Sequence, residues 1–139
     1  MACDLQMTQH NSIKWKCKTK LYKFSAHPDT YSECDFIMGF AGTANDMITA
    51  FEFFSNPDSF KKIPNLSGLT GLVLTAKGSI YLFDKLDKWL LVDVPYAAIG
   101  SGSMYALGAM SSGASTKEAV KAASKLDPYS GMGIKVLSF

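Results

Sequence analysis

The sequence has 139 residues, of which 47% are hydrophobic and 19% charged, with a formal net charge of +2. This composition excludes a disordered chain and provides enough apolar material for the core of one domain over 1–139. The net charge is close to neutral, and the sequence has no motif typical of a nucleic-acid-binding protein. The absence of an apolar run of about 18 residues argues against a membrane protein.

Residue periodicity and turn signals predict strands in runs, with helices between the runs. In chain order, we expect strands over 18–24 and 34–42, a helix over 43–56, strands over 70–76, 79–84 and 88–94, helices over 103–113 and 115–126, and a strand over 133–139. A turn is expected over 27–33, and a loop or helical stub over 57–68. The first helix should contribute Phe51, Phe53 and Phe54 to the core. This order favours an α+β layered fold over a parallel βαβ sheet.

Capping and turn residues support several of these boundaries. Thr43 precedes Asp46 by three residues, and Ser115 precedes Glu118 by three residues, the spacing of N-caps with an acidic first turn. Gly78 can take the positive φ that a tight hairpin turn needs between its two flanking strands.

Four lysines near the N-terminus alternate with other residues: Lys14, Lys16, Lys18 and Lys20. In a strand every second side chain faces the same way, so these lysines would form one cationic row. A solvated strand face accounts for such a row. A nucleic-acid surface is the alternative, although the sequence has no second basic cluster to support it.

The cysteines and histidines indicate no metal site. Cys3, Cys17 and Cys34 match no zinc spacing, and His10 and His27 stand alone, as surface or loop histidines do. An odd number of cysteines without a signal peptide indicates a reduced, cytoplasmic protein. We therefore expect neither a metal nor another cofactor.

The segment AIGSGSMYA, residues 98–106, runs from small apolar residues through a glycine–serine turn into the helix expected over 103–113. A turn of this kind exposes backbone N–H groups at a helix start and can hold a phosphate or an oxyanion. Two simpler explanations stay open: Ser101 is an N-cap of the helix, or the glycines only permit a tight turn.

Five segments together resemble the family of proteasome β-subunits and HslV peptidases, which are N-terminal-nucleophile hydrolases. They are MACDLQMT (1–8), KTKLYKF (18–24), GFAGTANDM (39–47), AIGSGSMYA (98–106) and LDPYSGMGIKV (126–136). They occur in the family's order and local spacing, and they cover nearly the whole chain. The resemblance implies an αββα sandwich, in which two antiparallel sheets lie between helix layers. The family's second long helix would be reduced, because 57–68 is short.

The resemblance also implies a catalytic site. Asp4 would pair with Lys20, and the N–H of Gly42 would bind the oxyanion. The other site residues that the resemblance implies are Ser101, Asp127 and Ser130. In this family an N-terminal threonine supplies the attacking hydroxyl, and its α-amine takes the proton. An ammonium such as that of Lys20 would lower the pKa of this amine and favour its basic form.

The nucleophile itself is expected on a strand that precedes the first segment, and this sequence starts at Met1. The expectation is therefore a threonine-type peptidase domain that is inactive as given. The alternative is a catalytically silent structural or interaction protein: a self-assembling subunit, an inhibitor or an adaptor. Cys3 and Ser101 are the other candidate nucleophiles, and Asp4 with Lys20 could instead be an ordinary ion pair.

Partners follow from the same resemblance. It implies a peptide substrate, a ring-like homo-oligomer and an ATPase unfoldase partner, with no nucleic acid and no membrane. A sheet that lacked its first strand would also carry an open edge, and unpaired edge groups favour pairing with another chain.

Overall fold

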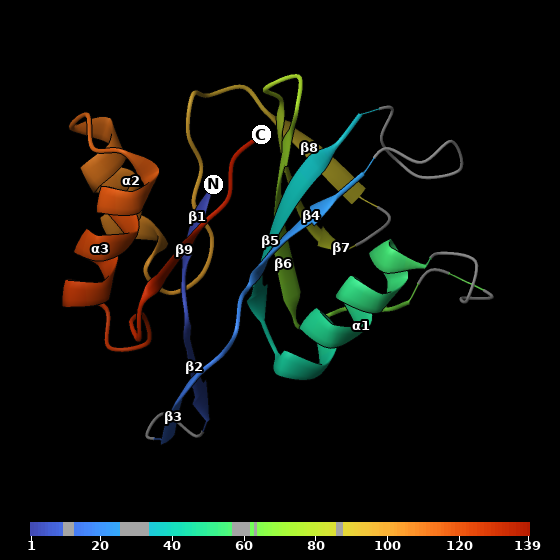
Figure 1. Cartoon of the computed structure of the whole chain (residues 1–139), viewed down its shortest axis with the longest axis horizontal. Helices are drawn as coiled ribbons and strands as arrows, with labels where there is room; N and C mark the ends of the chain where they lie inside the picture. The colour runs from blue at the N-terminus through green and yellow to red at the C-terminus, as the bar shows by residue number, and fades with distance from the viewer. Residues whose placement is uncertain (10–12, 26–33, 57–61, 63, 86–87) are drawn as a thin grey trace.

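The computed structural model describes residues 1–9, 13–25, 34–56, 62, 64–85 and 88–139 (Figure 1). The elements in chain order are β1 (Ala2–Asp4), β2 (Gln6–Gln9), β3 (Ile13–Lys16), β4 (Leu21–Phe24), β5 (Phe36–Gly42), α1 (Ala44–Ser55), β6 (Leu69–Thr75), β7 (Ile80–Lys85), β8 (Lys88–Val92), α2 (Ser103–Ser111), α3 (Thr116–Leu126) and β9 (Ile134–Val136). All the strand pairs among these elements are antiparallel.

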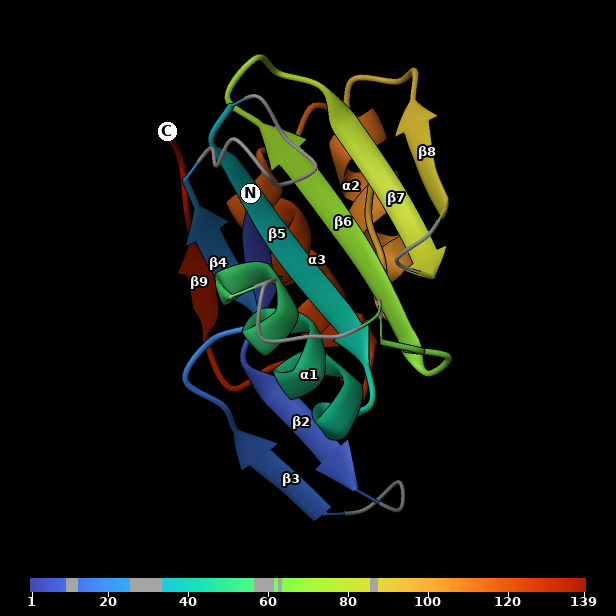
Figure 2. The same cartoon turned by 90° about the vertical axis from the view of Figure 1, so that its right-hand side faces the viewer.

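The elements form four layers. A five-stranded sheet of order β4-β5-β6-β7-β8 carries α1 on its outer face, as Figure 2 shows. A two-stranded sheet of β1 and β9 lies on the other side, and the α2–α3 pair packs beyond it, with α3 against both strands (Figure 1). The predicted αββα arrangement is therefore confirmed, and β2 and β3 form a separate hairpin.

The main core lies between α1 and the five-stranded sheet. Strand β5 is buried from Phe36 to Phe40, and Phe36, Met38 and Phe40 belong to the core cluster that also contains Phe53 and Phe54 of α1. Phe53 and Phe54 of α1 are buried, as expected. Phe51 is 38% exposed and lies at the edge of this core, with its ring centroid 4.5 Å from that of Tyr22.

The caps predicted at Thr43 and Ser115 and the turn predicted at Gly78 are present. Thr43 Oγ1 accepts a hydrogen bond from the N–H of Asp46 at 3.3 Å. Ser115 and Glu118 form a reciprocal capping box. Gly78 has φ 87°, the conformation predicted for the turn between β6 and β7. Local sequence therefore fixes the ends of these elements.

The segment before β4 differs from prediction. The strand expected over 18–24 begins only at Leu21, and the β2–β3 hairpin was not expected. Lys14, Lys16 and Lys18 are exposed, whereas Lys20 turns inward. The single cationic row is therefore wrong, because the chain leaves the extended conformation after β3 and the Lys20 ammonium pairs with a carboxylate.

The connection between α1 and β6 is short. Its described residues, 56, 62 and 64–68, contain no helix. The remainder of the predicted loop or stub, the turn over 27–33, and both histidines (His10 and His27) lie outside the described residues.

Candidate active site

Asp4 and Lys20 form one half of the candidate site. The end of β1 carries Asp4, and Lys20 immediately precedes β4, so elements of two different sheets bring the pair together. Lys20 Nζ lies 3.2 Å from both carboxylate oxygens of Asp4. Their side chains are only 15% and 18% exposed. The Oδ1 atom of Asp4 also accepts from the backbone N–H of Gln6 at 2.8 Å and of Gly131 at 3.3 Å, which orients the carboxylate.

Asp127, Ser101 and Ser130 form the other half. The Ser101 hydroxyl donates to Asp127 Oδ2 at 2.6 Å, and the Ser130 hydroxyl donates to the same oxygen at 2.7 Å. The backbone N–H of Tyr129 donates to Oδ1 at 3.1 Å. Asp127 is the C-cap residue of α3 and is 5% exposed. Its carboxylate therefore joins the loop before α2 to the loop after α3.

Two opposing effects act on the pKa of Asp127. Burial raises this pKa, because it disfavours the charged form. The hydrogen bonds from Ser101, Ser130 and the N–H of Tyr129, together with the nearby charge of Lys14, stabilise the carboxylate and outweigh burial. The net effect lowers the pKa, so Asp127 is ionised at neutral pH.

The glycine–serine turn is built around this carboxylate. The N-cap of α2 is Gly102, which makes no side-chain cap, so Ser101 as an N-cap is wrong: its hydroxyl is directed to Asp127. A Cβ atom on Gly102 would lie 2.8 Å from Ser130 Oγ and 3.3 Å from Asp127 Oδ2. A glycine is needed here because of this close approach, and its φ of −80° is ordinary.

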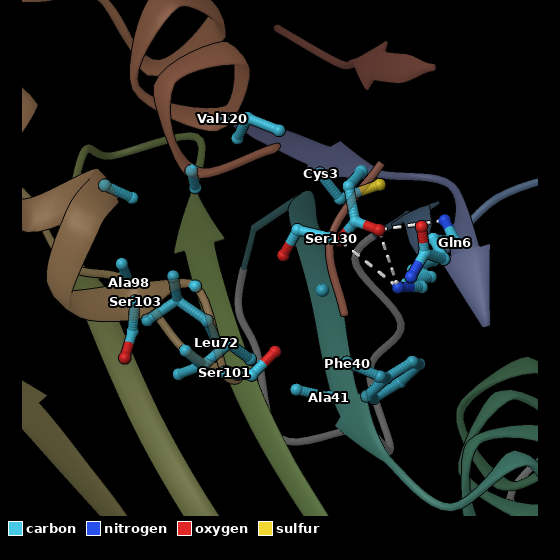
Figure 3. A pocket seen from close by; sticks show the side chains of 18 of the residues that line it. Cys3, Gln6, Phe40, Ala41, Leu72, Ala98, Ser101, Ser103, Val120 and Ser130 are labelled. Atoms are coloured by element: carbon cyan, nitrogen blue, oxygen red, sulfur yellow. Dashed lines mark hydrogen bonds and ion pairs between the residues drawn. The ribbon is translucent and has the colours of Figure 1, made fainter. Parts of the chain in front are cut away.

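A pocket of about 790 Å³ connects the two halves, and we call it the site pocket. Five of the six predicted residues line it: Asp4, Lys20, Gly42, Ser101 and Ser130. Asp127 lies behind Ser101 and Ser130, to which it is bonded. Figure 3 shows Ser101, Ser130, Cys3 and Gln6 among the side chains drawn there. Sequence segments far apart in the chain thus meet at one place.

Gly42 lines this pocket, and the hydrogen bonds of its neighbours indicate the side of β5 that its N–H faces. Phe40 donates its N–H to the Lys20 carbonyl at 3.2 Å, and Thr43 donates to the Gly68 carbonyl at 2.9 Å. Backbone N–H groups alternate in direction along a strand, so the N–H of Gly42 points to the Lys20 side of β5. Because Gly42 lies beyond the β4–β5 ladder, this donor is not used in that ladder.

Neither of the other candidate nucleophiles is activated. Cys3 lines the site pocket, but burial raises the pKa of its thiol and reduces the thiolate that would attack. The Ser101 hydroxyl donates a hydrogen bond to Asp127. The lowered pKa of this carboxylate makes it a weak base for removing the serine proton. Within the described part of the chain, no group of three or more His, Cys, Asp and Glu side chains is placed to hold a metal ion.

Replacing Ser101 with alanine should reduce stability and change its pH dependence. A hydrogen bond to a buried charge contributes about 1.5–3 kcal/mol, and its loss raises the folded-state pKa of Asp127 toward the unfolded value of about 3.9. A carboxyl with a lowered folded pKa stabilises the protein above its unfolded pKa, and this stability is lost as pH falls through the folded pKa. The free energy of unfolding, measured in urea, should therefore fall less from neutral to acid pH in Ser101→Ala than in the wild type.

The matched control is Ser111→Ala, which removes an exposed hydroxyl that donates to the Gly108 carbonyl at 2.8 Å. This variant should keep the wild-type pH dependence. If the free energy of unfolding falls as much in acid in Ser101→Ala as in the wild type, the Ser101 hydroxyl does not stabilise the Asp127 carboxylate.

No helix among the described residues has both the length and the apolar character required to cross a bilayer. No protein-family model matches the sequence, and no curated protein matches it. Several solved structures do match in fold. BPH from Thiobacillus denitrificans, solved in complex with epoxomicin, has a TM-score of 0.71 at 16% identity, covering 96% of this chain and 88% of that chain.

HslV from Trypanosoma brucei has a TM-score of 0.69 at 20% identity, covering 96% of this chain and 88% of that chain. The Anbu complex from Pseudomonas aeruginosa, solved as a helical assembly, has a TM-score of 0.71 at 11% identity, covering 99% of this chain and 75% of that chain. The chain therefore has the N-terminal-nucleophile hydrolase fold. Within that class, its fold is similar to HslV and proteasome-like peptidases, as the sequence predicted.

Proposed function

We propose that this chain is the domain of a threonine-type peptidase whose nucleophile lies on a segment preceding Met1. The observation that carries the proposal is the convergence of two polar groups on one pocket: the Asp4–Lys20 pair and the carboxylate of Asp127 with its two serine donors. The fold likeness to peptidases supports it.

The edge of β1 supports the position of that segment. Met1 and Leu137 exchange backbone hydrogen bonds of 2.8 and 3.0 Å, so the backbone groups of Ala2 and Asp4 point away from β9. Among the described strands, β1 pairs only with β9. Its other edge can accept a further strand, which would bring a terminal threonine to the site pocket.

Each residue then has a chemical role. The hydroxyl of the threonine attacks the scissile carbonyl, and its own α-amine takes the proton. Lys20 keeps that amine in its neutral form, and Asp4 holds Lys20 in place. Ser101 and Ser130, oriented by Asp127, bind the amine. The N–H of Gly42 binds the oxyanion of the tetrahedral intermediate.

The second candidate function is a catalytically silent subunit that assembles through exposed apolar side chains. Leu90 of the edge strand β8 is 64% exposed, and Met104 of α2 is 74% exposed. Self-association is part of both proposals, and the helical assembly of the Anbu complex supports it. An ATPase unfoldase partner and a cytoplasmic location belong to the peptidase proposal.

Two observations test the peptidase. The codons preceding Met1 should encode, in frame, a segment about one strand in length that carries a threonine. The protein expressed with that segment, and processed at the threonine, should hydrolyse fluorogenic peptides and gain the mass of epoxomicin on that residue.

The control is the same protein with the upstream threonine changed to alanine, which should do neither. An in-frame stop codon directly before Met1 would contradict the peptidase and favour the silent subunit, as would a processed protein without epoxomicin labelling.

A further inference from the structure

Gln6 is a buried polar residue to which the proposed mechanism assigns no task. It begins β2, two residues after Asp4, and is 5% exposed. A buried amide is costly unless it is hydrogen-bonded, so its partners indicate what the position requires. The sequence offered only its proximity to Asp4 as a signal.

The side chain of Gln6 holds the loop that follows α3. Its Nε2 donates to the Pro128 carbonyl at 2.8 Å, across 122 residues of sequence, and to Thr8 Oγ1 at 3.2 Å. A Cβ atom on Gly131 would lie 2.9 Å from Gln6 Oε1, so the loop backbone packs closely on the amide. Gln6 thus contacts the loop at both Pro128 and Gly131, on either side of Ser130.

This loop depends on such contacts because its backbone is irregular. Gly131 and Gly133 have φ 157° and 110°, and Met132, which is not a glycine, has φ 58°. A loop of this conformation does not form a regular ladder of backbone hydrogen bonds. Besides Gln6, it is held by Leu5, whose N–H donates to the Gly131 and Gly133 carbonyls at 3.0 and 3.1 Å.

The backbone of Gln6 contacts the other half of the site. Its N–H donates to Asp4 Oδ1 at 2.8 Å, and the same oxygen accepts from the N–H of Gly131. One residue therefore connects the carboxylate that binds Lys20 with the loop that carries Ser130. Gln6 therefore contributes to the spacing of the two halves, together with the direct Gly131–Asp4 bond and the bonds of Leu5.

We propose that Gln6 is a positioning residue that fixes the loop carrying Ser130 relative to the Asp4–Lys20 pair. The effect of Gln6 on catalysis rests on the proposed peptidase function, whereas its effect on the order of the loop does not. In an active enzyme, loss of the Gln6 amide would lower kcat more than it changes KM, because Gln6 Nε2 already donates to Pro128 and Thr8 within the protein.

Amide hydrogen exchange on the present chain tests the structural part. The variant Gln6→Met keeps the side-chain volume but cannot donate, so the amides of Tyr129 and Gly131 should exchange at least about tenfold faster. Amides of β5 and β6 should keep their wild-type protection. In Gln6→Glu the loop should be loosened at neutral pH and protected again in acid, because a protonated carboxyl can donate to the Pro128 carbonyl.

The control is Thr75→Val, which removes a buried hydroxyl bonded to the Ser79 carbonyl in the distant β6–β7 turn. It should leave Tyr129 and Gly131 protected even if it lowers global stability. Unchanged exchange in Gln6→Met, or equal loosening in Thr75→Val, would overturn the proposal. Selective loosening together with failed epoxomicin labelling would support Gln6 as a positioning residue and contradict the peptidase.

Discussion

The variant Gly42→Ala is expected to be less stable than the wild type by about 3 kcal/mol, and its pocket should be distorted. Gly42 has φ 140°, a backbone conformation that residues with a side chain rarely adopt, and such strain costs of order 1–3 kcal/mol. A Cβ atom there would also collide with the Gly68 carbonyl oxygen, which already accepts from the N–H of Thr43. Overpacking against backbone adds about 1–3 kcal/mol. Urea unfolding measures the loss.

The matched control for this variant is Gly108→Ala in α2. A Cβ atom there has no neighbour within 4 Å, and an alanine within a helix is about 1 kcal/mol more favourable than a glycine. The same chemical change should therefore have opposite signs at the two positions. A Gly42→Ala protein as stable as the wild type would mean that the end of β5 does not need this conformation.

The variant Lys20→Met is expected to lose at least about 10²-fold in kcat for peptide hydrolysis, in the protein that carries the upstream segment. The change removes the ammonium that would keep the terminal amine neutral, and it leaves Asp4 with only backbone donors. Activity should be measured across pH. The remaining rate should rise at higher pH, because the amine then loses its proton without help from Lys20.

Lys18→Met is the control, since this lysine lies two residues away and is exposed. It should keep wild-type activity at every pH. Full activity in Lys20→Met, with an unchanged pH profile, would show that the Asp4–Lys20 pair is structural and that the amine is activated by other groups.

Local signals predicted the regular elements well. Thr43 and Ser115 cap their helices as their spacing indicated, and Gly78 turns the chain between β6 and β7. These features depend on a few adjacent residues, so the sequence contains them. The order of the elements favoured an α+β layered fold, and the four layers were implied by the family resemblance.

Features set by tertiary contacts were harder to predict. Lys20 matched the alternation of the exposed lysines, but the carboxylate that draws it inward comes from β1. Ser101 has the sequence of a helix cap, but its partner Asp127 lies 26 residues further on. Gln6 had no local signal other than its proximity to Asp4, because the Pro128 carbonyl that it binds lies 122 residues away. The catalytic roles of these residues stay predictions until activity is measured.

The shared oxygen of Asp127 determines what the neighbouring hydroxyls can recognise. An ionised carboxylate has no proton to give, so Ser101 and Ser130 must each direct their single proton toward it. Only oxygen lone pairs then remain to face the pocket. At this point of the pocket the two hydroxyls therefore favour a hydrogen-bond donor such as an ammonium over an acceptor such as a phosphate.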